Sequence, residues 1–126
     1  MEILKFKPTY KREDGLTVIY DPSVPFPENF DIKIQGVIVF PPGAKGGNHK
    51  HPRIEAFYSP GDLTLVYINE NGQKQEMSMA PENDEYKLFI IPSNLPHTVV
   101  NRTGNELIMV EFANEEQHDV EKVELA

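Results

Sequence analysis

The stretch GAKGGNHKHPRIE, residues 43–55, contains two of the four histidines of the chain. His49 and His51 are two positions apart, so on an extended strand both imidazoles project from the same face. Glu55 lies four positions after His51, an even spacing that returns its carboxylate to that face if the strand continues or bends. Two imidazoles and a carboxylate that converge in this way predict a site for a divalent metal ion.

A second stretch, IPSNLPHTVVN at residues 91–101, supplies a third imidazole. His97 follows a turn bounded by Pro92 and Pro96 and begins a run of β-branched residues, as expected at the start of a strand. A His-x-His pair alone is more typical of histidines scattered over a surface. Together, however, the two stretches match a known two-part pattern, and the match favours one shared site.

The two stretches resemble the paired motifs of the cupin superfamily. In the first cupin motif, a glycine, a His-x-His pair, a glutamate and a second glycine follow one another at set spacings. This chain places Gly43, His49, His51, Glu55 and Gly61 in those positions, with one residue fewer before the last glycine.

The second cupin motif is matched less completely. Pro92, His97 and Asn101 are in register with it, whereas Tyr86 and Asn94 stand where the motif has glycine. Asparagine adopts the left-handed backbone conformation more readily than most residues, so Asn94 can still form the turn. The resemblance covers about residues 32 to 112, which is most of the chain.

The resemblance implies an all-β, single-domain cupin fold, a jelly-roll β-barrel with one divalent metal ion in its lumen. The implied ligands are His49, His51, Glu55 and His97, and Asn101 would close a turn. Fe, Mn, Ni and Zn all suit nitrogen and oxygen donors, and the sequence does not choose among them. Such a ligand set leaves one or two positions open on an octahedral ion, as in catalytic sites, while a closed, non-catalytic site remains the alternative.

Short strands joined by turns are expected along the whole chain. Eleven prolines and eight glycines interrupt it every few residues, and β-branched and aromatic residues fill the gaps. Asn71-Gly72 suits a two-residue hairpin, and residues 115–122 are the one place where we expect a helical turn. The predicted strands are Leu16–Tyr20, Asp31–Val39, Ile54–Tyr58, Leu63–Asn69, Gln73–Met79, Tyr86–Ile91, His97–Asn101 and Glu106–Phe112.

One domain accommodates a chain of this length. We expect an N-terminal extended arm over residues 1–30, the cupin barrel over 31–114 and an acidic C-terminal tail over 115–126. The arm is expected to pair with an edge strand, to wrap a partner subunit or to lie on the surface as a loop. The tail, which includes His118, is expected to be a solvated face.

Composition excludes several classes of function. The net charge of −8 and the lack of any Lys/Arg cluster argue against binding to nucleic acid or to an anionic membrane. The absence of cysteine excludes disulfides, thiolate metal sites and cysteine nucleophiles. Without an apolar leader or a long apolar run, the expected location is the cytoplasm. Fold analogy predicts a homodimer.

Two further residues are candidates for catalysis. Glu111 lies within the apolar run LIMVEFA, where its carboxylate would either face the metal cavity as a general base with a raised pKa or face solvent. Tyr67 would place its hydroxyl in the same cavity, although tyrosines of such folds more often only pack.

Three functions remain open, because the fold alone does not define chemistry. Residues 47–58, 90–101 and 110–114 look like small cupins of polysaccharide and deoxysugar biosynthesis. This favours an epimerase or isomerase that forms a metal-stabilised enediolate from a keto-sugar or sugar nucleotide. The alternatives are an Fe(II) or Ni(II) dioxygenase of a small enolate-type substrate and a non-catalytic module that binds a metal or small ligand.

Overall fold

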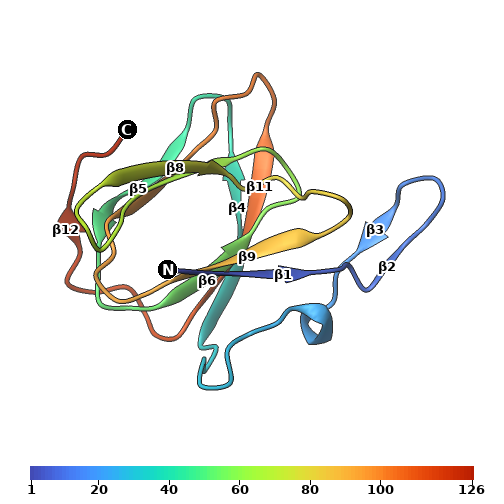
Figure 1. The fold of residues 1–126 in the computed structure, drawn as a ribbon, viewed down its shortest axis with the longest axis horizontal. Helices are drawn as coiled ribbons and strands as arrows, with labels where there is room; N and C mark the ends of the chain where they lie inside the picture. The colour runs from blue at the N-terminus through green and yellow to red at the C-terminus, as the bar shows by residue number, and fades with distance from the viewer.

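Short strands make up almost all of the secondary structure in the computed structural model, which describes residues 1–126 (Figure 1). A single turn of 3-10 helix, η1 (Asp21–Ser23), is the one helical element. No helix has the length and apolar character needed to span a membrane. The strands are β1 (Glu2–Phe6), β2 (Tyr10–Lys11), β3 (Thr17–Val18), β4 (Ile34–Phe40), β5 (Lys45–Lys50), β6 (Glu55–Tyr58), β7 (Thr64–Ile68), β8 (Lys74–Ser78), β9 (Tyr86–Ile91), β10 (His97–Val100), β11 (Leu107–Ala113) and β12 (Glu121–Lys122).

The strands pair antiparallel in two five-stranded sheets that form a β-sandwich. One sheet has the order β1-β9-β6-β11-β4 and the other has the order β12-β5-β10-β7-β8. β2 and β3 form a separate hairpin that projects from one end of the sandwich (Figure 1). The main core lies between the two sheets and contains Phe40, Phe57, Leu63, Leu65, Met79, Phe89, Ile91, Val99 and Met109.

The N-terminal arm explains why β9 is buried on both faces. Phe89 and Ile91 point into the space between the sheets, while Leu88 and Ile90 point the other way. Phe6 of β1 packs against that outer face and β1 pairs with β9 along its full length. The arm therefore completes the edge of its own sheet, which was one of the three expected arrangements.

The predicted all-β fold is confirmed, and every predicted strand overlaps an observed one. Most ends shift by one residue, but the strand predicted at Leu16–Tyr20 is only Thr17–Val18, and the one predicted from Asp31 begins at Ile34. Backbone pairing leaves two separate sheets and does not join them into one closed barrel. β5 was not among the predicted strands, because Gly46 and Gly47 lower its β-propensity.

The predicted helical turn at residues 115–122 is wrong. This segment contains β12, which pairs with β5, and Leu125 beyond it is buried against Val66 and Val100. The apolar residues of the tail gain more from this contact than a short isolated helical turn gains in water. Residues 116–122, with His118, are exposed as predicted for a solvated face, whereas the end of the tail is packed on the sandwich through Leu125.

Candidate metal centre

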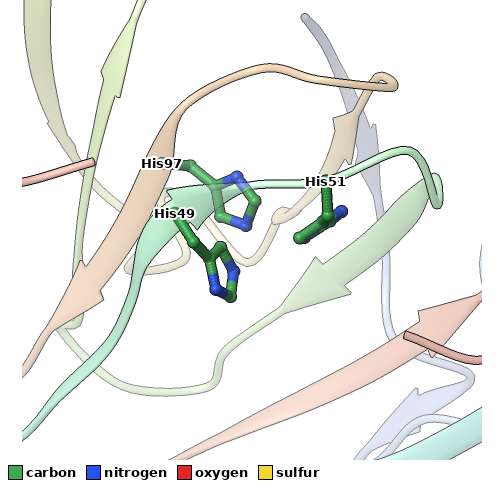
Figure 2. A group of neighbouring side chains, drawn as sticks. All are labelled: His49, His51 and His97. Atoms are coloured by element: carbon green, nitrogen blue, oxygen red, sulfur yellow. The ribbon is translucent and has the colours of Figure 1, made fainter. Parts of the chain in front are cut away.

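Three imidazoles meet between the two sheets. His49 lies on β5, His97 begins β10, and His51 follows directly after β5. Their ring centroids are 4.7 to 5.0 Å apart, and one ring nitrogen from each lies within 4.8 Å of the others. Figure 2 shows the three rings gathered around a common space, although they come from separate stretches of the chain. This is the spacing that ligands of a single metal ion require.

Hydrogen bonds to main-chain carbonyls define the tautomers of two of these rings. Nδ1 of His51 donates to the carbonyl oxygen of Arg53 at 3.0 Å, and Nδ1 of His97 donates to that of Leu95 at 2.8 Å. Because a carbonyl can only accept, the proton of the neutral tautomer is on Nδ1 in each ring, and Nε2 is the nitrogen that can offer a lone pair to the shared space. Nε2 of His51 is buried without a hydrogen-bond partner. A metal ion would supply the missing partner, so the donor set fits one.

Glu55 begins β6 and is almost completely buried beside the same nitrogens. Its Oε1 lies 3.3 Å from Nε2 of His97, and its Oε2 lies 3.5 Å from Nε2 of His51. Burial alone raises the pKa of Glu55, but the electrostatic influence of the neighbouring His97 and His51 outweighs burial and holds the pKa below its usual range. Glu55 is therefore a carboxylate, as a metal ligand must be.

The remaining imidazole is half-buried and stays neutral. Burial and repulsion from His97 and His51 lower the pKa of His49 to about 4. At neutral pH its lone pair is therefore available to a metal ion.

A local irregularity in β5 brings His49 next to His97. Gly47 has φ +128°, and a Cβ atom at this position would lie 2.7 Å from the carbonyl oxygen of His97. Only glycine allows this close approach of β5 to β10. The pairing register shifts at the same point, and His49 lies directly opposite His97.

Glu111 and Arg53 extend the site beyond the four predicted ligands. Nε and Nη2 of Arg53 contact Oε2 of Glu55 at 2.8 and 2.7 Å, and Nη2 lies 3.7 Å from Oε2 of Glu111 on β11. Burial and the negative charge of Glu55 raise the pKa of Glu111 to about 7, although Arg53 opposes this shift. Glu111 faces the interior and not solvent, which is the first of the two orientations expected from the sequence.

A cavity of about 200 Å³ adjoins these groups. Ile38, Phe40, Phe57, Val99 and Met109 form its apolar walls. The polar side chains along it are His49, Arg53, Glu55, His97, Glu111 and Gln117. Gln117 comes from the C-terminal tail, and nothing in its local sequence singles it out. Arg53 was not among the site residues predicted from the sequence, although it lies between His51 and Glu55 in the first motif.

Tyr67 is not among the residues that line this cavity. It is directly opposite His97 on the neighbouring strand β7. It packs against the main core and is one of the residues along a separate depression with Leu95 and Pro96. The structure therefore brings Glu111 into the cavity that His49 and His97 line, whereas Tyr67 lies beside His97 and is not among the residues along this cavity.

No protein-family model and no curated protein sequence matches the chain. Solved structures do match. A dTDP sugar isomerase from Desulfovibrio desulfuricans G20 aligns with a TM-score of 0.73 and 12% identity over 97% of this chain and 83% of its own. The capsular polysaccharide assembling protein CapF from Staphylococcus aureus aligns with a TM-score of 0.64 and 20% identity over 94% of this chain and 34% of its own.

An oxalate oxidase bound to the substrate analogue glycolate aligns with a TM-score of 0.57 and 21% identity over 71% of this chain and 45% of its own. This chain spans only between 27% and 34% of the length of the CapF chains that it matches. At these identities the similarity concerns the fold.

Proposed function

Since the chain has the cupin fold of these solved structures, we propose that it is a metal-dependent cupin enzyme. One divalent ion, Fe, Mn, Ni or Zn, is bound by His49, His51, Glu55 and His97. The observation that carries the proposal is the convergence of three imidazoles on a buried carboxylate, with Nε2 of His51 lacking any other partner.

The reaction we favour is epimerisation or isomerisation of a keto-sugar or sugar nucleotide. A divalent ion at this place supplies Lewis acidity toward a carbonyl oxygen. Glu111 lines the same cavity and is the group we assign to proton transfer. A carboxylate here takes the proton from the carbon next to a carbonyl group and returns it to the same or the adjacent carbon. Protonation of the same carbon on its opposite face is epimerisation, and it requires a proton donor on that face. Return of the proton to the former carbonyl carbon, with transfer of the hydroxyl proton to the former carbonyl oxygen, is isomerisation.

The apolar walls and the volume of the cavity limit the size of the substrate group that it can enclose. Phe40, Phe57 and Met109 form apolar walls, so a substrate that fills the cavity displaces its water, which strengthens electrostatic interactions there. The volume of about 200 Å³ is below the roughly 300–1,000 Å³ of sites that enclose a drug-sized ligand. The enclosed part of the substrate is accordingly no larger than a sugar ring, and any nucleotide lies outside. The dTDP sugar isomerase and CapF are neighbours in fold that support this choice.

A dioxygenase of a small enolate-type substrate is the second candidate. The aromatic, apolar walls favour it, because such a cavity suits a compact substrate next to a redox-active metal. The fold neighbours also include an oxalate oxidase.

Elemental analysis tests the metal centre first. We expect about one divalent ion per chain in the wild type and almost none in His49→Ala and His97→Ala. His118→Ala is the matched control, because His118 is an exposed histidine paired with Glu115 and Asp119. Equal metal content in all four proteins would refute the centre.

The reaction is tested on the metal-loaded protein. Isomerase chemistry predicts exchange of the α-proton of a keto-sugar with deuterium from solvent, followed by NMR, and loss of this exchange in Glu111→Gln. Oxygen consumption without exchange would favour the dioxygenase. If a broad panel of substrates shows neither proton exchange nor oxygen consumption, the result would favour the non-catalytic metal-binding module.

Cytoplasmic location and a homodimer are part of the same proposal. β4 is an edge strand whose outward side chains Val37 and Val39 are exposed by 61% and 51%, and a second copy would cover them. Size-exclusion chromatography with light scattering tests this, and a mass of 14.4 kDa would contradict it.

A further inference from the structure

Arg53 is a buried cation placed between two carboxylates. Its side chain is 12% exposed, and the carboxylates of Glu55 and Glu111 are 3% and 18% exposed. At such burial an ion pair is screened far less than at the surface. Arg53 lies on the connection between β5 and β6, which also carries His51, and so belongs to no strand.

The hydrogen bond and the ion pair from Arg53 to Glu55 end on the same carboxylate oxygen. Nε and Nη2 contact Oε2, at 2.8 and 2.7 Å. Oε1 accepts nothing from Arg53 and lies 3.3 Å from Nε2 of His97. The guanidinium therefore distinguishes two otherwise equivalent carboxylate oxygens.

Without Arg53, either oxygen could reach an ion at the centre. Oε2 is only 3.5 Å from Nε2 of His51, much as Oε1 is from His97. A carboxylate oriented in this way binds a metal ion through one oxygen or through both. Binding through both would use one more coordination position.

We propose that Arg53 is a positioning residue that restricts Glu55 to one metal-facing oxygen and so keeps a coordination position open for substrate. This inference rests on the proposed metal centre. The guanidinium also lies between Glu55 and Glu111 and offsets the repulsion between their charges. Its planar fork allows both roles, whereas the single ammonium of a lysine has no fixed geometry.

The test counts water molecules on bound Mn(II), in wild type, Arg53→Met and Arg53→Lys. Four protein donors leave two of the six coordination positions of Mn(II) for water. If Glu55 binds through both oxygens, only one position is left. We therefore expect the inner-sphere water-proton relaxivity per bound Mn(II) to fall about twofold in Arg53→Met. The Mn(II) electron paramagnetic resonance spectrum should change with it, and Arg53→Lys should restore part of both signals.

Arg102→Met is the matched control, since Arg102 forms an exposed pair with Glu76, and it should behave as wild type. Unchanged relaxivity and an unchanged spectrum in Arg53→Met would overturn the inference. Loss of Mn(II) binding in both Arg53 variants would overturn it too, by showing that Arg53 is needed for the centre itself. If His97→Ala binds Mn(II) as wild type does, the metal centre is wrong, and the inference fails with it.

Discussion

The two segments that carry the imidazoles reach the site by different means. Residues 45–55 supply three of the four proposed ligands from an irregular backbone, with φ +128° at Gly47 and +56° at Asn48. Residues 86–101 supply only His97, from two regular strands joined by a turn with φ +63° at Asn94.

Position in the sheet explains the difference. β10 is paired along its length on both sides, by β5 and β7, so it has little freedom to bend. β5 has β10 on one side and only the short β12 on the other. An irregular strand is tolerated where one edge is nearly free. The regular strand β10 thus holds His97 in a fixed position, and the irregular strand β5 bends so that His49 lies next to it.

Substitution in the irregular segment, residues 45–55, should have the largest effect on stability and metal binding. In Gly47→Ala the added Cβ would lie 2.7 Å from the carbonyl oxygen of His97 and 2.8 Å from Cα of Thr98, in a backbone region that favours glycine. We expect about 2–4 kcal/mol loss in the free energy of unfolding, measured in urea, and loss of bound metal. Gly36→Ala on β4 is the control, because nothing lies within 4 Å of its Cβ position. Metal binding unchanged in Gly47→Ala would contradict this account of how His49 meets His97.

Among the side chains of the regular segment, residues 86–101, Asn101 should contribute most to stability. Its buried side chain donates to the carbonyl oxygens of Phe40 and Asn105 and accepts from the main chain and hydroxyl of Thr103. Asn101→Ala should therefore cost about 2–3 kcal/mol of stability.

Unlike Gly47→Ala, Asn101→Ala should retain the metal, since Asn101 lies at the far end of β10 from His97. Denaturation and elemental analysis of the same sample check both points. Loss of metal from folded Asn101→Ala would show that the two segments are less independent than we describe.

The C-terminal tail should contribute a smaller effect through Asn48. The side chain of Asn48 accepts from the main-chain nitrogens of Leu125 and Ala126 and donates to the carbonyl oxygen of Ala126. Asn48→Gly keeps the positive φ and removes these bonds, so we expect about 1 kcal/mol loss of stability.

Amide hydrogen exchange should become faster at residues 123–126 in Asn48→Gly and stay unchanged in β9. Exchange accelerated equally in both places would mean a global effect, and not release of the tail.

The turn at Asn94 should show the smallest effect. Asn94→Ala places a side chain that disfavours positive φ in this turn and should cost about 1 kcal/mol. Asn94→Gly, which restores the glycine of the cupin motif, should stay within about 0.5 kcal/mol of wild type, because relief of backbone strain and loss of chain entropy nearly cancel. Thermal denaturation of both variants would decide this, and equal loss in the two would contradict it.

Local patterns made much of the fold predictable. β-branched and aromatic runs such as LTLVYI and YKLFII, bounded by proline, glycine or asparagine, favour strands wherever they occur, and these strands are present. β5 was missed because its glycines serve a close approach to β10 that local propensity does not reveal. β12 was missed because its stability comes from pairing with β5 and from burial of Leu125.

The sequence by itself determined the identity of the proposed ligands, because the spacing of His49, His51, Glu55 and His97 is a local property of two short stretches. Only the tertiary structure decided that Arg53 contacts one of the two oxygens of Glu55 and not the other. It also decided that Glu111 and, from the tail, Gln117 line the cavity. Those relations depend on distances between strands that are remote in the chain. Such distances follow from the packing of whole sheets, which no short sequence pattern encodes.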